Sequence, residues 1–235
     1  MTRRAGAAAL GAAALLWAAA SALSPHAQAS RAARDELLYY PSGRFLKEAV
    51  LGYDQAASAV TWLRTVQYYG LHRRSDRKYD MMYHLCDIVT DLDPRFTEPY
   101  VFGSFVLFTD GRRPAEGEKL LLKGLAANPD SWEIAFENGF VNYVFLGNQA
   151  EAARYFTLAG TLPDAPEYTS RFAAFAAQRA GDLRMAAALW QEVAARTTNT
   201  WLREMASEKS EELRAQIDAG SAGGPVEPAS GDGTP

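Results

Sequence analysis

The sequence predicts an all-α fold: an α-solenoid of about four helix-turn-helix repeats with a C-terminal capping helix. One pattern recurs in four segments at a spacing of 34 or 35 residues, and a proline follows each of the first three, where a helix must stop. The segments are Met82-x-x-x-Cys86-x-x-Val89, Gly117-x-x-x-Leu121-x-x-Gly124, Ala152-x-x-x-Phe156-x-x-Ala159 and Ala186-x-x-x-Trp190-x-x-Val193. The prolines are Pro94, Pro129 and Pro163.

A small residue four positions before a large one, at a period near 34 residues, is the second-helix signature of the tetratricopeptide repeat (TPR). The chain therefore resembles a TPR protein over residues 54–196. The repeats that this resemblance implies are 54–94, 97–130, 132–163 and 166–196. It implies an architecture for binding a partner, but it does not name the partner.

The first 29 residues resemble a targeting segment. Arg3 and Arg4 precede an uncharged apolar stretch at 5–23, and Ala27-Gln28-Ala29 supplies the pattern that a signal peptidase cleaves. We therefore expect a signal peptide, export to a bacterial periplasm and a mature chain that begins at Ser30. The alternative is an uncleaved anchor at 5–23, which would hold the chain on the inner membrane facing the periplasm.

Composition narrows the partner classes. The full chain has a formal net charge of −4, and residues 30–235 carry 22 basic and 28 acidic side chains. This mildly acidic balance argues against nucleic acid as a partner, because phosphate binding needs a clustered basic surface. The single cysteine permits no internal disulfide.

The N-terminal part of the mature chain is predicted to contain an irregular arm at 30–53 and a helix at 54–69 that Gly70 ends. Val60, Leu63 and Val66 form the apolar stripe of that helix. The following basic stretch is interpreted as a solvated loop. Its alternative is a contact with inner-membrane headgroups or an acidic partner. The side chains concerned are Arg73, Arg74, Arg77 and Lys78.

The remaining helices follow from the repeat. They are expected at 80–91, 97–109, 114–127, 132–146, 149–161, 166–179 and 183–195. Gly111, Gly147 and Gly181 are each expected to adopt a positive φ in a turn within a repeat. A capping helix is predicted at 199–218, because the last repeat has an apolar face that no neighbour covers. The tail at 219–235 is predicted to be disordered.

A second resemblance concerns the stretch before and within the first repeat. Its segments are Tyr40-Pro41-Ser42-Gly43-Arg44-Phe45-Leu46, Leu51-Gly52-Tyr53-Asp54, Trp62-Leu63-Arg64 and Gln67-Tyr68-Tyr69-Gly70. They are similar to the opening of a group of exported bacterial TPR proteins that have no assigned activity. This similarity implies an exported, repeat-built bacterial protein.

Chemical motifs are sparse. His84, Cys86 and Asp87 lie close in sequence, but Cys86 occupies the large core position of its repeat, where a cysteine behaves as a small apolar residue. We therefore expect no metal, no cofactor and no catalytic residue. The sequence predicts a non-enzymatic protein.

Aromatic residues are the stronger functional signal, because they gather on the predicted first helices, which line the concave face in TPR proteins. Phe105, Phe140 and Phe175 recur every 35 residues and are expected to stack as a ladder. The predicted partner-binding groove consists of Phe105, Phe136, Phe140, Tyr143, Arg171, Phe175 and Arg179. The sequence thus predicts an adaptor or scaffold that binds a peptide or protein. The alternative is a membrane-tethered structural subunit of an inner-membrane assembly.

Overall fold

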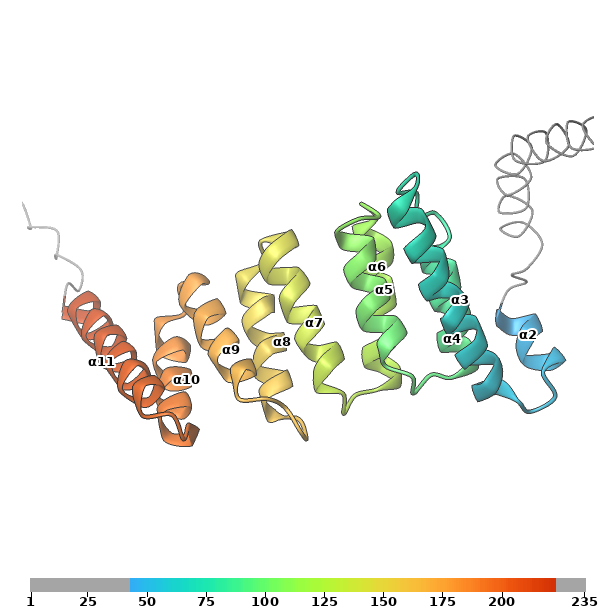
Figure 1. The fold of residues 1–235 in the computed structure, drawn as a ribbon. Helices are drawn as coiled ribbons and strands as arrows, with labels where there is room; N and C mark the ends of the chain where they lie inside the picture. The colour runs from blue at the N-terminus through green and yellow to red at the C-terminus, as the bar shows by residue number, and fades with distance from the viewer. Residues whose placement is uncertain (1–42, 223–235) are drawn as a thin grey trace, which may run out of the picture. The chain divides into compact units, whose positions relative to one another are not determined.

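The computed structural model describes residues 43–222 (Figure 1). The chain divides after Asp54 into two compact units. The predicted targeting segment and the last residues of the predicted tail lie outside the described residues. Within the first unit, α2 (Gly43–Ala49) occupies part of the predicted irregular arm, which is therefore wrong for this stretch. The composition of this stretch explains the helix, because after Gly43 and Arg44 it contains only residues of ordinary to high helix propensity, Phe45, Leu46, Lys47, Glu48 and Ala49.

The described residues are all-helical, as predicted, and contain no strand. From the second unit onward the helices follow one another without long connections. They are α3 (Asp54–Arg74), α4 (Met82–Leu92), α5 (Glu98–Phe108), α6 (Pro114–Ala127), α7 (Trp132–Val141), the π-helical segment η1 (Asn142–Leu146), α8 (Gln149–Thr161), α9 (Tyr168–Arg179), α10 (Leu183–Arg196) and α11 (Thr200–Ala222).

Each helix from α4 onward packs against the next one in the chain, which is compatible with an α-solenoid. The large residues of the recurring pattern are all fully buried. They are Cys86, Leu121, Phe156 and Trp190. Two apolar clusters result, one built mainly from α4 to α7 and one from α7 to α11.

Short polar side chains begin several of these helices. Ser131 Oγ accepts a hydrogen bond from the backbone N–H of Ile134 (3.3 Å), and Asp182 Oδ1 accepts one from Met185 (2.9 Å). Asn148 and Asn199 cap α8 and α11 in the same way. Such caps satisfy a backbone donor that the first helical turn leaves without a partner.

Helix α3 differs from its prediction in length and in orientation. It continues through Gly70 to Arg74, and the predicted inward stripe of Val60, Leu63 and Val66 is exposed. Ser58, Thr61 and Thr65 are buried instead. Their hydroxyls donate to the backbone carbonyls of Val89, Ala57 and Thr61, so burial leaves no donor without a partner.

The turns that the sequence predicted within the repeats show a second difference. Gly147 and Gly181 adopt the expected positive φ, at 67° and 81°, but Gly111 does not. The left-handed residue there is Arg112, with φ 53°. Gly111 N donates to Val106 O (2.7 Å) and Arg113 N donates to Leu107 O (2.8 Å). In this wider turn, the residue with left-handed backbone follows Gly111 by one position.

The predicted helix at 132–146 is regular only as far as Val141. The following η1 segment is π-helical and ends at Leu146, directly before Gly147. This change brings the Phe145 ring into a stacked contact with Phe108, with ring centroids 5.6 Å apart. The π-helical turn therefore lies at a packing contact between α5 and the segment that follows α7.

Candidate binding groove

An apolar groove of about 400 Å³ lies between α5 and α7. Its residues are Thr97, Glu98, Val101, Phe102, Phe105, Glu133 and Glu137, and we call this set the α5/α7 groove. Glu98, Val101, Phe102 and Phe105 are spaced at i, i+3, i+4 and i+7, which places them on one face of α5. Glu133 and Glu137 are four residues apart and share one face of α7.

Three carboxylates line the α5/α7 groove at different depths. Glu98 is exposed, Glu133 is half-buried, and Glu137 is only 8% exposed. Glu98 accepts a hydrogen bond from Thr97 Oγ1 (3.3 Å), and Glu133 accepts one from Ser131 Oγ (2.8 Å). Glu137 is different, because no donor among residues 43–222 reaches its buried Oε1.

Burial without a partner changes the acidity of Glu137. Desolvation raises its pKa from 4.5 to about 7, because the surrounding apolar groups stabilise the neutral form relative to the charged one. The groove therefore holds a carboxyl group that changes its charge near neutral pH.

The structure brings only one of the predicted groove residues, Phe105, into the α5/α7 groove, where its side chain is 43% exposed. Phe136 packs instead against Phe156, Tyr168 and Phe172, with ring centroids 5.0 to 5.3 Å apart. Phe136 is thus part of the packing between α7, α8 and α9.

The predicted ladder of Phe105, Phe140 and Phe175 is wrong. No ring contact joins these three residues, all of which lie in the described part of the chain. Phe140 contacts Phe145 edge-on at 6.2 Å, and Phe175 packs at 90° on the buried Trp190 with centroids 4.8 Å apart. Phe140 is held by the π-helical segment and Phe175 by Trp190 of α10, so the three rings do not form a continuous strip.

The other predicted groove residues form a separate pair. Arg179 donates to Tyr143 Oη (3.1 Å), and its guanidinium carbon lies 5.4 Å from the centre of that ring. This contact joins η1 to α9. Arg171, also on α9, is half-buried, and its Nε has no hydrogen-bond partner among the described residues.

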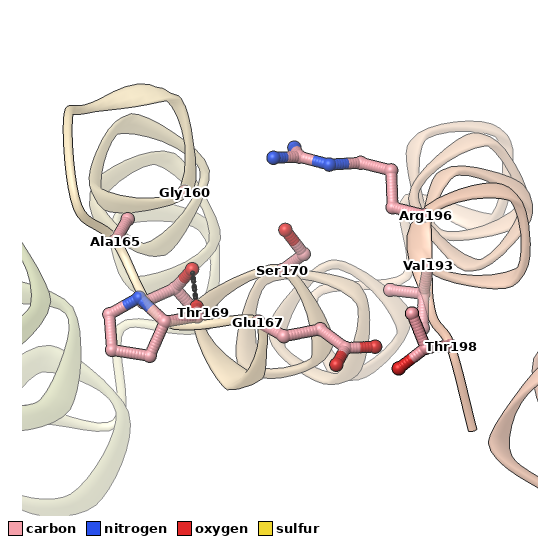
Figure 2. A pocket seen from close by; sticks show the side chains of 9 residues that line it. Gly160, Ala165, Glu167, Thr169, Ser170, Val193, Arg196 and Thr198 are labelled. Carbon is pink, nitrogen blue, oxygen red and sulfur yellow. Dashed lines mark hydrogen bonds between the residues drawn. The ribbon is translucent and has the colours of Figure 1, made fainter.

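A second, polar pocket of about 180 Å³ lies between α8, α9 and α10 (Figure 2). Glu167 and Ser170 come from the start of α9, and the Arg196 side chain extends from α10 above Ser170 in this view. Arg196 is already paired with Glu192 at 2.9 Å, and Thr169 donates to Pro166 O at 2.8 Å. Two of the polar side chains that line this pocket, Arg196 and Thr169, are thus already engaged within the protein.

The residues considered for metal binding or catalysis do not converge. Cys86 is fully buried, which raises the pKa of its thiol, and Asp87 Oδ1 lies 2.7 Å from Lys123 Nζ. Within residues 43–222, no group of three or more His, Cys, Asp or Glu side chains is placed to hold a metal ion.

The basic side chains of the predicted membrane contact all lie at the exposed end of α3 and in the turn after it. Arg73 contacts Tyr69 through a hydrogen bond of 3.2 Å. Asp76 lies within the same stretch and pairs with His72 at 2.6 Å, so the patch is not uniformly basic. None of the helices in the described range has the length and apolar character needed to cross a membrane.

Sequence reasoning missed the three glutamates of the α5/α7 groove. The available signal was Glu137 itself, the one acidic residue in the otherwise uncharged segment Ile134-Ala135-Phe136-Glu137-Asn138-Gly139-Phe140. Its charge interrupts a helix that is otherwise suited to burial.

The chain was compared with protein-family models, curated proteins and solved structures, and none of the three comparisons found a match.

Proposed function

We propose that the chain is a TPR-like α-solenoid that acts as a non-enzymatic adaptor and holds a segment of a partner protein in the α5/α7 groove. The observation that carries this proposal is the combination of apolar walls and acidic side chains in one solvent-open groove. Exposed aromatic surface beside polar groups is typical of sites that bind other proteins.

The targeting pattern at 1–29 supports an exported, periplasmic location, and the adaptor would then act in the bacterial envelope. A tethered structural subunit is the second candidate, and the exposed Arg73, Arg74, Arg77 and Lys78 favour it. The mass of the exported protein separates the two, because cleavage after Ala29 removes any tether.

The adaptor proposal is tested by Phe105→Ser in the full exported chain, with Leu122→Ser as the matched control. Phe105 lies in the groove and is 43% exposed, whereas Leu122 lies on α6 outside it and is 50% exposed. Both variants are compared with the wild type by thermal melting and by crosslinking to envelope proteins in living cells.

We expect Phe105→Ser to lose its crosslinked partners while it melts like Leu122→Ser, because an interface depends on a few aromatic anchors. Equal recovery of partners by both variants would contradict the adaptor proposal for this groove.

A further inference from the structure

We propose that the α5/α7 groove recognises a basic side chain, a lysine or arginine that projects from an apolar segment of the partner. This inference rests on the proposed function and names the chemical class of the partner. Its geometric basis is the placement of Glu98 on α5 and of Glu133 and Glu137 on α7, so that carboxylates face one apolar groove from both helices.

The charges of the groove have one sign. No lysine, arginine or histidine is among its residues, and no salt bridge in the described range involves its three glutamates. Helix α6, which packs against both α5 and α7, carries Lys119 and Lys123, but both are engaged elsewhere. Lys119 lies over the Tyr83 ring at 5.1 Å, and Lys123 bridges Asp87 and Asp91.

Glu137 is the residue through which the groove would select a cationic side chain. Its side chain is more than nine-tenths buried, and its Oε1 has no donor within residues 43–222. A buried polar atom without a partner is costly, and a hydrogen bond from a charged donor offsets more of that cost than one from a neutral donor. A cationic side chain that enters the groove would supply the missing donor and the opposite charge together.

The apolar residues of the groove suit the hydrocarbon part of a lysine or arginine side chain. Val101, Phe102 and Phe105 present apolar surface on the α5 side, and the hydrocarbon stem of lysine or arginine can pack on that surface while its head reaches a carboxylate. The face of a phenylalanine ring also attracts a cation. An acidic segment or a terminal carboxylate would instead meet three carboxylates and would be repelled.

The test uses the full mature chain and a displayed library of random peptides, selected on the wild type and counterselected on Phe105→Ser. From a selected peptide, two synthetic versions are made that differ only at one basic position, with lysine in one and norleucine in the other. Both are titrated against the wild type, against Glu137→Gln, and against the control Glu211→Gln on the exposed surface of α11.

We expect the selected peptides to be enriched in lysine or arginine. The wild type should prefer the lysine peptide over the norleucine peptide by about tenfold or more, and Glu137→Gln should lose most of this preference. Glu211→Gln should keep it. Because a folding defect would weaken both peptides equally, the ratio of their affinities reports on charge recognition alone.

Other outcomes separate the two proposals. If the selected peptides depend on Phe105 but carry no basic residue, the proposal that the groove recognises a basic side chain is overturned and the adaptor function stands. The same conclusion follows if Glu137→Gln keeps the preference of the wild type for the lysine peptide. The absence of any peptide that depends on Phe105 would overturn both. If the wild type forms a dimer and Glu137→Gln is a monomer, a second copy of this chain occupies the groove. That result would overturn the proposal that a segment of another protein binds there.

Discussion

Gly139 on α7 lies directly against the ring of Phe156 on α8. A Cβ atom at position 139 would lie 2.5 Å from Cδ1 of that ring, closer than nonbonded carbon atoms can approach. Only glycine therefore permits α7 and α8 to pair at this distance. The fully buried Phe156 cannot easily move away, because it also contacts Phe136 and Phe172.

We predict that Gly139→Ala lowers the free energy of unfolding by about 1–3 kcal/mol through overpacking. Gly70→Ala on α3 is the matched control, because its Cβ would meet no atom within 4 Å. It should be neutral or stabilising by up to about 1 kcal/mol, since alanine favours a helix more than glycine does. Chemical denaturation of both variants measures the difference, and equal effects would contradict the close approach.

Cys86 should behave as an inert core residue. Burial raises the pKa of its thiol, and the neighbouring charge of Asp87 acts in the same direction, so the reactive thiolate is scarce. We expect a thiol reagent to label the folded chain only as fast as the region opens. Cys86→Ala should lose about 1 kcal/mol through a small cavity. Rapid labelling of the native protein would show that the sulfur is accessible.

The recurring small and large residues predicted much of the core, because a fixed spacing on a helix fixes which side chains face inward. Cys86, Leu121, Phe156 and Trp190 are all buried for this reason. The pattern could not orient α3. There, hydroxyl side chains such as Thr65 bond to backbone carbonyls of their own helix and become suitable for burial, while larger apolar residues such as Leu63 face outward.

The candidate site was less predictable than the core. An aromatic side chain on α5 or α7, such as Phe105 or Phe136, can pack internally or face the groove, and a shift of one residue along the helix decides which. The π segment after Val141 adds such a shift and directs Phe140 and Phe145 toward each other. The buried position of Glu137 depends on how α5 and α7 approach, which single-helix periodicity does not contain.

Lys123 should contribute to stability through its contact with two carboxylates on α4. Its Nζ lies 2.7 Å from Asp87 Oδ1 and 2.5 Å from Asp91 Oδ1, and its side chain is 29% exposed. We predict that Lys123→Met costs about 1 kcal/mol, because it leaves two like charges one helical turn apart. The difference from the wild type should shrink in high salt, which screens that repulsion. Denaturation at low and high ionic strength tests this, and a loss independent of salt would show that the lysine acts through packing.

The titration of Glu137 should make the free energy of unfolding depend on pH. Its pKa is about 7 in the folded chain and 4.5 in its ordinary state, so the folded chain binds the proton more tightly than the unfolded chain does. Stability therefore falls as the pH rises from about 4.5 to about 7 and stops changing through this group above that window. The loss amounts to at most about 3 kcal/mol, since each pKa unit corresponds to about 1.4 kcal/mol.

Glu137→Gln removes this titration while it keeps the shape of the side chain. The variant should gain stability relative to the wild type at pH 8, by up to about 3 kcal/mol more than at pH 4. Any constant cost of the buried amide appears at both pH values and cancels from the comparison. Denaturant unfolding of wild type, Glu137→Gln and the exposed control Glu211→Gln across this range measures the effect. A difference between wild type and Glu137→Gln that stays constant with pH would mean that the carboxyl finds a charged or hydrogen-bonding partner in solution, and the groove would then lack the unpaired acid on which recognition of a basic side chain depends.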